Sequence, residues 1–182
     1  MLFCEKYWAK QLSRIPKDNH NKDAIKDDFH IFKVNMNCLL TNKTQSSLSE
    51  IQHYIKTADM EFKQLDGSKE DMIFWRGINK EKSGNKIKKY LYEKLLNLKK
   101  DDIYIMRNYA YATENRLIAE SYKGRCKGEE GILIKMHVPK GAQYSKKWYE
   151  VIFPRYSKWI CLNNQKMGDT TFIELKYNLP DT

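Results

Sequence analysis

The chain has 182 residues, a formal net charge of +10 and a hydrophobic fraction of 41%. This length is typical of one domain, and the hydrophobic fraction excludes an intrinsically disordered chain. No apolar run reaches the ~18 residues that a membrane-spanning helix needs, and residues 1–6 lack the start of a secretory signal. We therefore expect a single, monomeric domain over 1–182 that does not use a membrane. Its expected site of action is the cytoplasm, where it is made or where a separate component delivers it into a host cell.

The basic residues are concentrated in the C-terminal part of the chain. Residues 1–70 hold 11 basic and 10 acidic side chains, whereas residues 71–182 hold 22 basic and 13 acidic ones. This excess favours an anionic partner, which a nucleic acid, a phosphate-bearing cofactor or an acidic protein surface would each provide. The alternative is a lysine-rich surface that contacts only solvent.

The cysteines and histidines do not form a metal-binding pattern. The four cysteines are Cys4, Cys38, Cys126 and Cys161, and no two of them form a C-x-x-C pair. The four histidines are scattered as well, so the ligand spacing of a zinc site is missing. Widely spaced cysteines without a signal sequence are typical of free thiols in a reducing compartment. We expect no metal site.

Apolar residues recur at helical spacing in the N-terminal third of the chain. The first such face consists of Ile25, Phe29, Phe32, Met36 and Leu39. Residues 47–50 (Ser-Leu-Ser-Glu) form a capping box, which predicts the start of a second helix. A third helix is predicted by apolar residues at positions 87, 91, 95 and 98.

The C-terminal half has the alternation and the turn residues of β-strands. Strands are predicted over 71–78, 102–113, 132–138, 149–153, 157–162 and 170–177, and the second range holds two short strands around Arg107-Asn108. Helices followed by strands predict an α+β fold with mainly antiparallel sheets. We place a helical part at about 1–70 and a sheet part at about 71–178.

Two charged residues stand in or beside apolar strands. Arg76 lies in the run Phe-Trp-Arg-Gly, and Glu150 opens the run Glu-Val-Ile-Phe. Charges in apolar segments are costly unless they are paired or used, and the chain has neither a Walker loop nor a glycine-rich dinucleotide motif. Arg76 and Glu150 are therefore the first candidates for a site. The alternatives are a structural ion pair for Arg76 and a strand end for Glu150.

Arg76 and Glu150 belong to a series of six motif-like segments that follow one another along the chain. They are Met36-Asn37-Cys38-Leu39-Leu40, Phe74-Trp75-Arg76-Gly77, Tyr109-Ala110-Tyr111-Ala112-Thr113, Tyr122-Lys123-Gly124-Arg125, Val138-Pro139-Lys140-Gly141-Ala142 and the segment from Trp148 through Glu150 and Pro154-Arg155 to Lys158. Their order resembles that of the mono-ADP-ribosyltransferase toxins, which include the clostridial Rho- and actin-modifying exoenzymes and phage-encoded transferases. The corresponding family motifs are a helical Ile-Asn-x-x-Leu, an aromatic-Arg-Gly strand, a Ser-Thr-Ser strand, an aromatic-x-Gly-Arg loop, a Pro-Lys-Gly strand end and a Glu/Gln-x-Glu strand with Pro-Arg.

The resemblance implies a fold and an activity. The fold would be α+β and ADP-ribosyltransferase-like, with an N-terminal helical lobe packed on two mainly antiparallel sheets around an NAD cleft. The activity would be transfer of ADP-ribose from NAD to a macromolecular target, protein or nucleic acid, with release of nicotinamide and without a metal. Breaking the bond between nicotinamide and ribose develops an oxocarbenium-like cation, which a fixed carboxylate stabilises.

The resemblance also assigns roles to residues. Glu150 would stabilise the cation, Arg76 would bind the NAD pyrophosphate or its neighbouring ribose, and Thr113 and Tyr111 would hold Glu150. Further cofactor contacts are expected from Asn37, Tyr109, Tyr122 and Arg125, with Tyr122 stacked on the nicotinamide ring. Trp148 and Tyr144 are expected to recognise the target.

Three positions depart from the family pattern. Tyr111 stands where the family has the first serine of Ser-Thr-Ser, Trp148 stands where it has Glu or Gln, and Thr41 replaces an arginine. A tryptophan cannot accept a hydrogen bond, but it can stack on a nucleobase. The alternative function is therefore a catalytically impaired module of the same fold that binds nucleic acid or an acidic protein.

Overall fold

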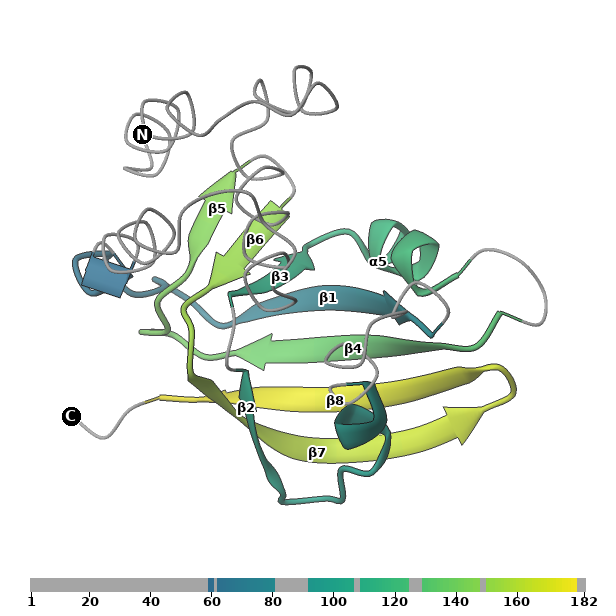
Figure 1. Ribbon diagram of the computed structural model, residues 1–182. Helices are drawn as coiled ribbons and strands as arrows, with labels where there is room; N and C mark the ends of the chain where they lie inside the picture. Colours follow the sequence, from purple (N-terminus) through teal and green to yellow (C-terminus); the bar gives the residue numbers. More distant parts are fainter. Residues whose placement is uncertain are drawn as a thin grey trace, which may run out of the picture. The chain divides into compact units, whose positions relative to one another are not determined.

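The computed structural model describes residues 59–60, 62–80, 92–106, 109–124, 129–147 and 150–179 (Figure 1). Contacts divide the chain into two compact units, 1–64 and 65–182. The second unit contains the sheet, and the description below concerns this unit. The helices predicted within 25–39 and 47–55, and with them most of the expected helical lobe, lie outside the described residues.

In the described part of the chain, eight strands form the sheet, and seven of them correspond to the predicted ones. Their bounds are β1 Met72–Asn79, β2 Ile103–Met106, β3 Ala110–Thr113, β4 Gly131–Val138, β5 Ser145–Lys147, β6 Glu150–Phe153, β7 Ser157–Met167 and β8 Thr170–Asn178. Their hydrogen-bonded order is β2-β7-β8-β4-β1-β3-β6-β5. The two short strands expected around residues 107–108 are β2 and β3, and they lie in different parts of the sheet (Figure 1).

The sheet is mainly antiparallel, as the sequence predicts. The exception among the described strands is β4, which pairs with β8 in parallel from Gly131–Thr170 to His137–Lys176. Two sheets were expected, whereas the described strands form one continuous sheet, because β1 and β3 pair at Trp75 and Thr113. The prediction of mainly antiparallel pairing is therefore confirmed, and the strand order comes from the structure.

One face of the sheet carries the hydrophobic core. Phe74, Ile134, Ile173 and Trp159 come from four neighbouring strands, and none of the four side chains is exposed. The helical segment 92–96, part of the predicted third helix, contributes apolar side chains to the same core.

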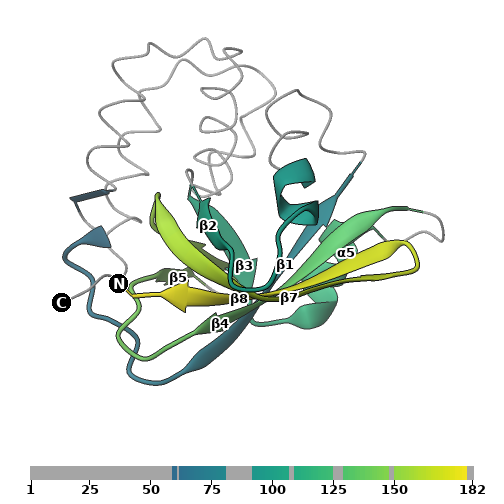
Figure 2. The same cartoon turned by 90° about the horizontal axis from the view of Figure 1, so that it is seen from below.

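Helix α5, Arg116–Lys123, follows β3 directly. Its N-cap is Asn115, whose side chain accepts a hydrogen bond from the backbone N–H of Leu117, as N-cap residues commonly do. The helix packs against β1 on the face opposite the core, because Gly77 has no Cβ to hold the backbone of Ala119 away. Figure 2 shows the sheet nearly edge-on, between α5 and the helical segment 92–96.

Candidate functional site

Three adjacent strands, β1, β3 and β6, bring the principal candidate residues together. Trp75 of β1 pairs with Thr113 of β3, and Thr113 in turn pairs with Glu150 of β6. Since neighbouring strands lie ~4.8 Å apart, the backbone of Arg76, the residue after Trp75, is roughly 10 Å from that of Glu150. The register therefore brings the backbones of the predicted arginine and glutamate close together.

The backbone around Arg76 is paired differently on its two sides. β1 pairs with β4 along its whole length, from Met72–Val138 to Asn79–Gly131. Towards β3, the described residues of β1 pair only at Trp75. The two strands therefore separate beyond this pair, and Arg76 lies where the separation begins.

Arg76 is a cation surrounded by protein and still partly open to solvent. Burial lowers the pKa of Arg76, and the nearby Tyr104 and Tyr111 oppose this shift. Burial also raises the pKa of Tyr104, so this phenol is neutral at physiological pH. No described carboxylate forms an ion pair with Arg76. An enclosed guanidinium without a carboxylate partner stays charged and is suited to bind an anion such as phosphate.

Thr113 and Glu150 share one face of the β3–β6 pair because they are directly opposed. Thr113 is 6% exposed, and its hydroxyl oxygen accepts a hydrogen bond of 3.1 Å from the backbone N–H of Asn115. This bond holds the threonine side chain at the entry to α5. Glu150 is partly buried. The prediction that Thr113 positions Glu150 stays a prediction, and the register brings the two residues close enough for it.

Sequence analysis missed two polar residues near these strands. Tyr104 is 5% exposed and interacts electrostatically with Arg76; the alternation over 103–106 was the signal that its side chain points inward. Ser145 is fully buried, and its hydroxyl has no hydrogen-bond partner among the described residues. Ser145 and Tyr111 both pair with Ile152, so the three lie in one row across β3, β6 and β5.

The other predicted tyrosines differ in exposure. Tyr109 is 2% exposed, and the guanidinium of Arg155 lies 5.9 Å from its ring centroid. Tyr144 packs edge-on against Phe74, with ring centroids 5.1 Å apart. Tyr122, in the last turn of α5, is 58% exposed. Tyr109 and Tyr144 thus have packing contacts, whereas Tyr122 presents its ring to solvent; their roles towards a ligand stay predictions.

Three predicted site residues, Asn37, Arg125 and Trp148, lie outside the described residues, as does Thr41. Within the described part of the chain, no group of three or more His, Cys, Asp or Glu side chains is placed to hold a metal ion. The same part contains no helix with the length and apolar character that crossing a membrane requires.

Known structures share this fold. C3larvin toxin, an ADP-ribosyltransferase from Paenibacillus larvae, matches with a TM-score of 0.55 and 18% identity over 98% of this chain and 96% of that one. The Vis toxin, an ADP-ribosyltransferase from Vibrio splendidus, matches with a TM-score of 0.61 and 16% identity, covering 96% and 81%. The C3 exoenzyme of Clostridium limosum matches with a TM-score of 0.59 and 17% identity, covering 97% and 93%. No protein-family model matches the sequence, and no curated protein does. The expected ADP-ribosyltransferase-like fold is confirmed.

Proposed function

We propose that the protein is an NAD-dependent mono-ADP-ribosyltransferase that modifies a macromolecular target. The observation that carries the proposal is the enclosed Arg76, without a described carboxylate partner, beside the paired Thr113 and Glu150. The fold supports it, because three solved proteins of this fold are described as ADP-ribosyltransferases or as an exoenzyme of the C3 type. The substrate would be NAD, bound as an anion through its pyrophosphate.

The reaction asks little of the protein beyond binding and electrostatics. The bond between ribose C1′ and the nicotinamide nitrogen breaks, and its electron pair leaves with nicotinamide, which becomes neutral. The carboxylate of Glu150 stabilises the positive charge that develops on the ribose. A nucleophile of the target then forms the new bond to C1′ and gives up its proton.

Arg76 would hold the substrate for this step. A guanidinium binds phosphate through two parallel N–H···O bonds, which fixes orientation as well as position. The neutral Tyr104 beside it does not compensate its positive charge, which stays available to the phosphates. Tyr111 replaces a serine of the family pattern, and its longer side chain would reach the site from further away.

The residue at position 148 bears on the nature of the target. A Vis structure was solved with agmatine, a small guanidinium compound. In this chain, Trp148 occupies the position at which the family's arginine-modifying members have glutamate. We therefore place the target among proteins modified at residues other than arginine or among nucleic acids.

Release of nicotinamide from NAD tests the proposal. Glu150→Gln removes the negative charge with almost no change of shape, and we expect activity to fall by about 10²–10³-fold. Arg76→Lys keeps the charge but loses the two-pronged phosphate contact, so we expect chiefly a raised KM. Glu93→Gln, at an exposed helical position, is the matched control and should match wild type.

Two results would overturn the proposal. The first is activity of Glu150→Gln equal to that of wild type. The second is the absence of release in every tube, including one with cell lysate and labelled NAD as a source of targets; this result would favour the impaired binding module. Thermal unfolding of each variant, measured in parallel, separates a lost activity from a lost fold.

A further inference from the structure

The face of the sheet opposite the core presents basic and aromatic side chains. On β1, β4, β8 and β7, residues that alternate with buried core residues point to this side. We call this surface the open sheet face and define it by Trp75, Lys135, His137, Phe172, Lys176 and Lys158. Among the described residues, helix α5 is the element that packs on this side, over Gly77.

Aromatic rings are placed for stacking at one end of the open sheet face. Trp75 and Phe172 are both partly exposed, and their ring centroids are 6.4 Å apart. The guanidinium of Arg116 lies 5.0 Å from the Trp75 ring. A planar cation over a tryptophan and a second ring beside it form a surface on which a nucleobase can stack.

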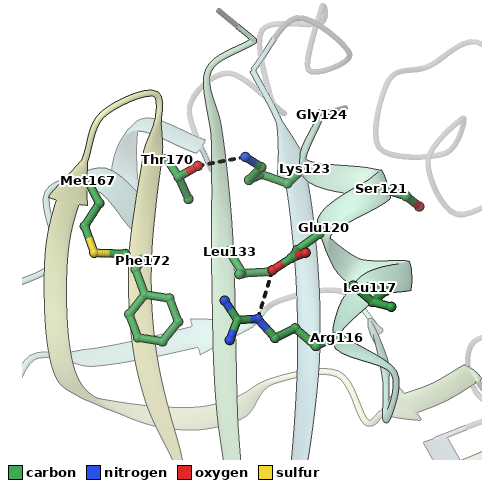
Figure 3. A pocket seen from close by; sticks show the side chains of 10 residues that line it. All are labelled: Arg116, Leu117, Glu120, Ser121, Lys123, Gly124, Leu133, Met167, Thr170 and Phe172. Atoms are coloured by element: carbon green, nitrogen blue, oxygen red, sulfur yellow. Dashed lines mark hydrogen bonds and ion pairs between the residues drawn. The ribbon is translucent and has the colours of Figure 1, made fainter. Parts of the chain in front are cut away.

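A pocket adjoins these rings. It has a volume of about 580 Å³ and is lined in part by Arg116, Leu133, Phe172 and Lys123 (Figure 3). Glu120 pairs with Arg116 at 2.9 Å, and Lys123 donates to the hydroxyl of Thr170 at 2.7 Å (Figure 3). This volume lies within the range of about 300–1,000 Å³ that is typical of small-ligand pockets. A lining that combines apolar side chains with two cations suits a base with its sugar and phosphate.

The charge of the open sheet face is predominantly positive. Lys158 and Lys176 are exposed and form no ion pair with any described residue. The carboxylate of Glu174 is shared between His137 at 2.9 Å and Lys135 at 3.6 Å. One carboxylate therefore faces several basic groups, and the excess positive charge attracts a polyanion.

We propose that the open sheet face binds single-stranded nucleic acid, with a base at Trp75 and Phe172 and phosphates along Lys135, Lys176 and Lys158. Unpaired bases are required because a duplex hides the faces that would stack on the rings. Four neighbouring strands of the sheet carry these residues, and an open sheet surface with aromatic side chains is also what stacks two or three bases in known RNA-binding domains. The proposal is independent of ADP-ribosyltransferase activity, since no step of binding involves NAD or Glu150.

Fluorescence anisotropy with a labelled oligo(U) of about 12 nucleotides tests the proposal. Three lysine–phosphate contacts predict a slope of about −2 when the logarithm of the association constant is plotted against the logarithm of the salt concentration. Binding should therefore be about 20-fold weaker at about 200 mM salt than at about 50 mM. The double variant Lys158→Gln/Lys176→Gln should reduce this loss to about threefold. Lys69→Gln/Lys140→Gln changes the charge equally at exposed positions outside the open sheet face, and it should leave the slope unchanged.

A second variant separates stacking from charge. Phe172→Leu should weaken binding by about fivefold or more while the salt slope stays the same. Glu150→Gln should bind as tightly as wild type, which keeps this test apart from that of the activity.

Four results would each overturn the proposal. They are no binding at low salt, equal effects of the two double variants, equal affinity for a duplex of the same length, and displacement of the oligonucleotide by polyglutamate at a similar concentration of charges. The last result would assign the open sheet face to an acidic protein.

Discussion

Replacing Gly77 with alanine should destabilise the fold through helix α5. A Cβ at this position would collide with the carbonyl oxygen of Ala119 and would lie 2.6 Å from the backbone nitrogen of Lys123. Both atoms belong to the helix backbone, which cannot rotate aside as the end of a side chain can. Overpacking in a protein interior usually costs about 1–3 kcal/mol, and a collision with backbone places this change at the upper end, at about 3 kcal/mol.

Gly168→Ala is the matched control for this prediction. Gly168 has a φ of +60°, and an added Cβ would meet nothing within 4 Å. The backbone conformation alone opposes alanine there, at a cost of about 1–2 kcal/mol. Urea unfolding of both variants, followed by tryptophan fluorescence, measures the two free energies of unfolding. If Gly77→Ala is no more destabilising than Gly168→Ala, close packing of α5 on β1 is not the reason for the glycine after Arg76.

Three further predictions concern stability. Trp159→Ala should lower the free energy of unfolding by about 3–5 kcal/mol, because the side chain is fully buried; a loss below 1 kcal/mol in urea unfolding would contradict its central place in the core. Asn115→Ala should cost about 1 kcal/mol by removing the cap on the Leu117 N–H, and Asn115→Asp should restore most of it; equal melting temperatures of the two variants would argue against capping. The pKa of Glu174 is lowered, chiefly by its hydrogen bond with His137. Its carboxylate therefore stabilises the fold at pH values above the pKa that it has in the unfolded chain, and this contribution is lost as pH falls through its lower pKa in the folded protein. Glu174→Gln should therefore lose stability less steeply in acid and differ from wild type by less than about 1 kcal/mol at pH 7; identical pH profiles in thermal unfolding would refute the pairing.

Strands were predictable wherever apolar and polar residues alternate. The clearest alternation, over 132–138, corresponds to β4 within one residue. β7 extends to Met167, five residues beyond the predicted end at 162, because the strand continues after a register shift between Cys161 and Asn163 with polar, exposed side chains. β5 was missed because its three residues, Ser-Lys-Lys, carry no apolar signal. Hydrogen bonds to neighbouring strands hold these segments in extended conformation. The local sequence pattern does not show which strands become neighbours.

The candidate site was predictable in its residue types but not in its geometry. Charges in apolar strands singled out Arg76 and Glu150, since such charges are costly without a use. Their proximity depends on the pairing of Trp75, Thr113 and Glu150 across three strands, which is a long-range feature. The parallel pairing of β4 with β8 is equally long-range, and no local pattern predicts it.

The central position of β8 has a consequence for how the chain folds. β8 is the last described strand in the sequence, yet it lies between β7 and β4 in the sheet. During synthesis, the strands before it can pair locally, but one edge of β4 stays without its partner until residues 170–178 have been made. Such long-range pairing is slow, and an unpaired apolar strand invites association with other chains. A fragment that ends before residue 170 would therefore consist of two separate pieces of sheet, β2-β7 and β4-β1-β3-β6-β5, rather than a smaller version of the same fold.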